Sequence, residues 1–211
     1  PKLLHVKDHE GKPVDPGVTT DLYKKTLSIA WPSTVEGALM SIIGSVDTMM
    51  VGSLGYAALA AVGLAGQPRM ILTVLVQALC VGTTAITARR KGAQDREGAN
   101  ECFRQSMILV TILGLLFGAA GYLVAEPFLT LAGANEDTLE LSITYFRVIS
   151  LAFLPSCWQL CICAAMRAIG KTRVTMVTNI TANLINVVLN YILINGKLGL
   201  PALGVKGAAI A

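Results

Sequence analysis

The chain has 211 residues, of which 54% are hydrophobic and only 14% are charged, with a formal net charge of +4. Soluble domains carry about 25% charged residues, so this composition excludes an ordinary soluble globule. We therefore expect an integral membrane protein, whose spans must be helices or the strands of a closed barrel.

The N-terminal 25 residues differ in composition from the rest of the chain. They hold nine of the thirty charged side chains and lack the apolar core of a signal peptide. We expect residues 1–25 to be a polar cytoplasmic tail or pre-helix and residues 26–211 to be a transmembrane lobe. Because the chain begins at proline rather than methionine, we also expect residues in front of it.

Five apolar runs after Thr26 have the length of membrane-spanning helices, which need about 20 residues. None shows the strict alternation over about ten residues that is typical of barrel strands. The expected spans are 27–51, 57–88, 107–125, 143–166 and 174–195. A run of small residues then stops at Ala211, which predicts the beginning of a sixth span. The fold class is therefore an all-α, polytopic membrane bundle of about five spans and a truncated sixth.

The basic residues indicate how the spans are oriented. If five spans alternate, thirteen of the seventeen basic residues fall on one side, in the N-terminal tail and in the loops after the second and fourth spans. Basic loops stay in the cytoplasm. We therefore predict a multi-pass protein of the plasma (inner) membrane with a cytoplasmic N-terminus.

Small residues and cysteines inside the spans indicate packing. Gly114 and Gly118 form a GxxxG pair, which either permits close helix contact or arises by chance in a glycine-rich span. The five cysteines are odd in number, which argues against a disulfide framework. Cys157 and Cys161 are one helical turn apart without a nearby histidine, so we favour packing over metal binding.

Two acidic residues, Glu36 and Asp47, lie inside the first span. An acid at the centre of a membrane helix costs about 2.5–3.5 kcal/mol on insertion scales. Their spacing of eleven residues is three helical turns plus about 20°, which places them on one face about 16 Å apart. Glu36 is near the expected cytoplasmic end, where a structural role and a functional role are both open. Asp47 has no basic residue within ten positions, which favours function.

Four asparagines follow one face of the fifth span. Asn179, Asn183, Asn186 and Asn190 are spaced by four, three and four residues. Such a face meets either a wet cavity or a neighbouring helix, where the amides would join the two helices. Further intramembrane polar residues are Gln67, Arg69, Gln77 and Gln159.

Motifs of enzymes and nucleic-acid binders are missing. Gly170-Lys171-Thr172 has the ending of a phosphate loop, but no strand precedes it and Ala165 stands where the first glycine is needed. No basic patch is interleaved with aromatic residues, so nucleic acid is not an expected partner. We expect neither an enzyme nor a bound cofactor.

Several segments resemble the multidrug and toxic compound extrusion (MATE) family, in a NorM-like form. Pro32 to Gly63, with the run EGALMSIIGSVDTMMVG, resembles the family's first span. TARRKGAQDREGA (87–99) and MRAIGKTR (166–173) resemble two of its cytoplasmic loops. NVVLNYILINGKLGLPALGVKGAAIA (186–211) resembles the fifth span running into the sixth.

The resemblance implies a twelve-helix antiporter of two lobes that exports cationic, amphipathic compounds in exchange for protons or sodium. This chain would be its amino-terminal lobe, with the carboxy-terminal lobe missing. Asp47 matches the family's first-span acid and would bind the proton or sodium, with Glu36 as a lesser candidate. The expected cavity residues are Asn183, Asn186, Asn190, Gln67 and Gln159. Asn190 stands where some members have an aspartate, so the coupling ion stays open.

Two alternatives remain at this stage. A related flippase for lipid-linked sugars would line its cavity with several cations, whereas this sequence offers mainly Arg69. In a membrane scaffold that transports nothing, the acids and amides would only hold helices together.

Overall fold

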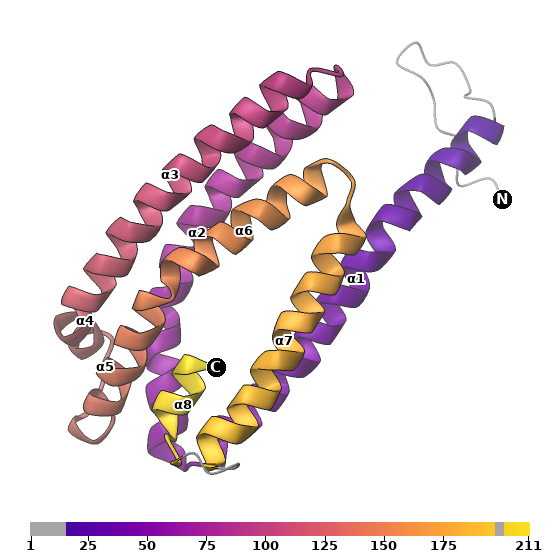
Figure 1. The fold of residues 1–211 in the computed structure, drawn as a ribbon. Helices are drawn as coiled ribbons and strands as arrows, with labels where there is room; N and C mark the ends of the chain where they lie inside the picture. Colours follow the sequence, from indigo (N-terminus) through magenta and orange to yellow (C-terminus); the bar gives the residue numbers. More distant parts are fainter. Residues whose placement is uncertain (1–15, 197–200) are drawn as a thin grey trace.

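A computed structural model describes residues 16–196 and 201–211, and every regular element in these ranges is a helix. Figure 1 shows their arrangement. The helices are α1 (Pro16–Gly52), α2 (Tyr56–Gly92), α3 (Arg96–Leu123), α4 (Ala125–Leu131), α5 (Glu136–Leu151), α6 (Phe153–Ala168), α7 (Thr172–Asn195) and α8 (Val205–Ile210).

Four of the described helices, α1, α2, α3 and α7, contain segments long and apolar enough to cross a membrane. The bent pair α5 and α6 supplies a fifth crossing if it counts as one span. This confirms the all-α membrane fold expected from the sequence. The helices extend beyond the apolar runs: α1 already begins at Pro16, within the expected polar tail, whose residues 1–15 lie outside the described ranges.

The expected fourth span is divided into two helices. Asp137–Leu151 and Phe153–Ala168 meet at an angle of 50°. Pro155 explains the position of the break, because a proline ring clashes with the carbonyl group four residues earlier and donates no hydrogen bond. That carbonyl belongs to Leu151, the last residue of α5. The kink leaves Ala152 between the helices.

α2, α3 and α6 pack against one another around a buried apolar cluster that includes Val76, Val110 and the thiols Cys80, Cys157 and Cys161. Glycines of α3, Gly114 and Gly118, allow α6 and α5 to approach it closely. A Cβ atom at Gly118 would lie 2.9 Å from the carbonyl oxygen of Ser150. The GxxxG pair therefore lies at a helix contact.

α1 and α7 form a second unit and pack against each other along their length. Figure 1 shows this pair inclined away from α2, α3 and α6, with α8 between α7 and α5. α8, of six residues, lies in the segment where the sequence predicts the start of a sixth span.

Candidate functional site

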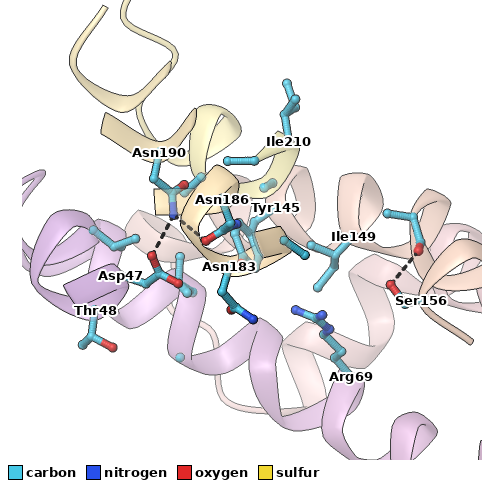
Figure 2. A pocket seen from close by; sticks show the side chains of 18 of the residues that line it. Asp47, Thr48, Arg69, Tyr145, Ile149, Ser156, Asn183, Asn186, Asn190 and Ile210 are labelled. Carbon is cyan, nitrogen blue, oxygen red and sulfur yellow. Dashed lines mark hydrogen bonds between the residues drawn. The ribbon is translucent and has the colours of Figure 1, made fainter. Parts of the chain in front are cut away.

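A cavity of about 640 Å³ lies between the two helix units. Six helices line it, namely α1, α2, α5, α6, α7 and α8, and its volume is within the usual range of small-molecule sites. Its lining is rich in polar side chains, several of which are labelled in Figure 2. They are Asp47, Thr48, Arg69, Tyr145, Ser156, Gln159, Asn183, Asn186 and Asn190.

Asp47 is held by the amide of Asn190. The Asn190 Nδ2 donates to Asp47 Oδ1 at 3.0 Å and to Asn186 Oδ1 at 3.3 Å. Asn190 is only 3% exposed. Because its amide nitrogen faces the carboxylate, its oxygen faces away, and this buried Oδ1 has no hydrogen-bond partner among the described residues. Buried polar atoms are almost always paired, so the site has an acceptor that lacks its donor or cation.

Glu36 belongs to a separate polar network beside the cavity. The Asn179 Nδ2 donates to Glu36 Oε1, and the Gln159 Nε2 donates to Asn179 Oδ1 at 3.0 Å. Glu36 and Asn179 are each 7% exposed, and neither lines the cavity. Since Glu36 is on α1, Asn179 on α7 and Gln159 on α6, the network joins three helices.

The two carboxylates follow one geometric rule. Each accepts from an asparagine 143 positions later in the chain. The later acid on α1 bonds to the later asparagine on α7, so the two helices run parallel. Both pairs lie on the same helix face, because eleven residues correspond to about three turns.

Asn179, Asn183, Asn186 and Asn190 of α7 (the asparagine stripe) therefore show both arrangements expected from the sequence, a helix contact and a cavity wall. Asn179 joins helices, whereas Asn183, Asn186 and Asn190 line the cavity. Asn183 is also tied to its own helix, donating to the carbonyl of Asn179 at 2.7 Å.

Of the other polar residues considered in the sequence, some line the cavity and some do not. Gln159 lines the cavity, but Gln67 is exposed outside it. Arg69, one of the further intramembrane polar residues of the sequence, also lines the cavity. Tyr145 and Ser156 were not singled out at all. The position of Ser156, directly after the kink-forming Pro155, is a signal that could have identified it.

The loops that follow α2 and α6 meet at one end of the molecule. Lys91 donates to the carbonyl oxygen of Ile169, the residue that caps α6. Arg90 pairs with Asp95, and this contact, together with the backbone N–H of Gly98, holds the pKa of the Asp95 carboxyl below its usual range. Both basic loops thus lie on the same side, as the charge pattern predicts.

Comparison with known proteins agrees with this architecture. The MatE family model matches residues 32–192. The multidrug resistance protein PmpM of Pseudomonas aeruginosa is 31% identical over 188 residues, covering 89% of this chain and 39% of that protein. A probable multidrug resistance protein NorM of Thermotoga maritima is 28% identical over 192 residues, covering 90% of this chain and 41% of the relative.

A solved structure is similar over the same region. It is described as an outward-facing multidrug resistance MATE family transporter of the MOP superfamily. The TM-score is 0.81 at 29% identity, covering 88% of this chain and 40% of the other. The chain thus spans about 40% of the length of the proteins it matches; the solved structure is named as a transporter and the two relatives as multidrug resistance proteins. The family match extends over most of the sequence, and this chain belongs to the MatE family of membrane transporters.

Proposed function

We propose that this chain is the amino-terminal lobe of a secondary antiporter that exports cationic, amphipathic compounds in exchange for protons or sodium. Asp47 carries the proposal, because it is the carboxylate that lines the cavity among the described residues. As an anion it attracts a cationic compound, and binding of a proton or sodium ion cancels that attraction. A ligand drives a conformational change only if it binds two states differently, and this competition supplies the difference.

The surroundings of Asp47 suit a small cation. The Asp47 carboxylate and the Asn186 side-chain oxygen, both bonded to the Asn190 amide nitrogen, are hard oxygen donors, the ligand type preferred by hard cations. A sodium ion at the Asp47 carboxylate is one option. A proton on Asp47 is the other option, and no second carboxylate is within hydrogen-bonding reach in the described structure to share it.

The competing functions fit the cavity less well. A flippase for lipid-linked sugars must hold a strongly anionic headgroup, yet Arg69 is the one basic side chain among the described residues lining the cavity. A scaffold needs no cavity of about 640 Å³ with a carboxylate on its wall.

The deciding experiment is transport by the full-length protein that contains this chain, in inverted membrane vesicles. We expect Asp47→Asn, which keeps the size and loses the charge, to abolish efflux of a cationic dye driven by a proton or sodium gradient. Asp137→Asn, at an exposed position in α5, is the matched control and retains efflux. Efflux by Asp47→Asn at the wild-type rate, with the same ion dependence, contradicts the proposal.

A further inference from the structure

Arg69 is a cation in the wall of the cavity, in the middle of a membrane-spanning helix. It lies thirteen residues after Tyr56, the first residue of α2, which corresponds to about 20 Å along the helix axis. Figure 2 shows its guanidinium turned toward the cavity, on the opposite side of Asn183 from Asp47.

The guanidinium has no partner in the described part of the chain. The ion pairs found there are Arg90–Asp95 and Arg104–Glu101, and neither involves the cavity. Asp47 is bonded to Asn190 instead. An arginine inside a membrane protein normally pairs with an acid or a carbonyl group, and its planar fork of donors fits a carboxylate especially well. Among the described residues, Arg69 is thus a cation that pairs with no acid, and its guanidinium can bind an anion.

Asp47 and Arg69, of opposite charge, line the same cavity. Tyr145, from α5, also lines this cavity. The cavity is therefore bipolar, with an acid on α1 and a base on α2. A compound that carries only positive charge is attracted by Asp47 but repelled by Arg69. The repulsion lowers its affinity for the cavity.

We propose that Arg69 binds an anionic group of the cargo, and that the cavity favours zwitterionic compounds whose carboxylate meets Arg69 while their cationic group meets Asp47. This inference rests on the proposed transport function and narrows its substrate class. Asn183, between the two charges in the view of Figure 2, adds an amide that can bond to a polar linker.

Rhodamine 110 and rhodamine 123 form a matched pair of probes, because they share one chromophore and differ by a methyl ester. The first has a free carboxylate and a cationic xanthene ring system, and the second is a cation only. Binding to the purified full-length protein is measured by fluorescence polarisation. Transport of the same dyes in vesicles is measured separately.

We expect Arg69→Gln to weaken rhodamine 110 binding by about tenfold or more, the effect of losing one charge-assisted hydrogen bond. Rhodamine 123 binding stays within about twofold of wild type or improves, as expected from the loss of a repulsive charge. Arg69→Lys keeps part of the preference. Arg89→Gln removes an equal charge from the last turn of α2, outside the cavity, and changes neither dye.

An equal change in both dyes, no change in either, or no binding of rhodamine 110 to the wild type overturns the inference. Selective binding that depends on Arg69, combined with a failure of ion-driven efflux, contradicts the transport proposal and leaves the anion site intact. The two proposals therefore fail through different measurements.

Discussion

Glu36 and Asp47 both lie on the face of α1 that meets α7, and each accepts a hydrogen bond from an asparagine, yet only Asp47 lines the cavity. The difference follows from their neighbours. Gln159 completes the network around Asn179 and Glu36, whereas the Asn190 Oδ1, which faces away from Asp47, has no partner among the described residues. A satisfied network stabilises helix packing, and an unsatisfied one is open to a ligand.

We therefore expect Glu36→Ala to lower stability more than transport. It leaves the buried Asn179 amide without an acceptor, at a cost of about 1–3 kcal/mol, and the melting temperature in detergent falls. Glu36→Gln keeps an acceptor oxygen and retains most of the stability. The double variant of Glu36→Ala and Asn179→Ala loses less than the sum of the single changes, because the two side chains are in contact.

Transport per folded molecule separates this role from ion coupling. For Glu36→Gln it stays close to wild type, in contrast to Asp47→Asn. Loss of efflux by Glu36→Gln at an unchanged melting temperature would show that Glu36 binds the coupling ion.

At the scale of helices, the packing of α3 depends on the absence of side chains at its glycines. A Cβ atom at Gly118 would lie 2.9 Å from the backbone oxygen of Ser150, which cannot move as a flexible side chain does. Gly118→Ala should therefore separate α3 from α5 and lower the melting temperature. Gly82→Ala is the matched control on α2, since nothing lies within 4 Å of its added Cβ. Equal melting temperatures for the two variants would contradict this packing.

Hydropathy predicted the elements better than their ends or bends. The apolar runs marked α1, α2, α3 and α7, because about 20 apolar residues suffice to identify a span. The polar residues 16–25 belong to α1, and hydropathy does not detect a helix that continues outside the apolar run. The break at Ala152 was missed, although Pro155 was visible as a helix-breaking residue.

The site was predictable in part for similar reasons. A carboxylate in a span and a stripe of amides stand out in any sequence, so Asp47, Asn183, Asn186 and Asn190 were singled out, and they line one cavity. Which amide faces the cavity depends on contacts between helices 143 residues apart. Arg69 and Tyr145 approach Asp47 only through packing of α2 and α5 beside α1 and α7, which helical periodicity within one span does not reveal.

The orientation of the whole molecule follows from charge together with the loop contacts. Lys91 and Ile169 bring the basic loops after α2 and α6 to one end. α3 has 28 residues and spans about 42 Å, so the acidic segment around Asn135 lies at the other end. Because basic loops are retained in the cytoplasm, we predict that Asn135 faces the outside of the cell.

Thiol labelling in intact cells checks this orientation. In a Cys102→Ser background the other four cysteines of this chain are buried, and labelling of the same background without an introduced cysteine is subtracted as the blank. An impermeant maleimide added outside should label Asn135→Cys and leave Arg173→Cys unlabelled, although both positions are exposed. Permeabilised cells should label both, which shows that Arg173→Cys is shielded by the membrane and not by folding. Outside labelling of Arg173→Cys alone would invert the topology, and the Lys91 and Ile169 contact would then lie at the extracellular end.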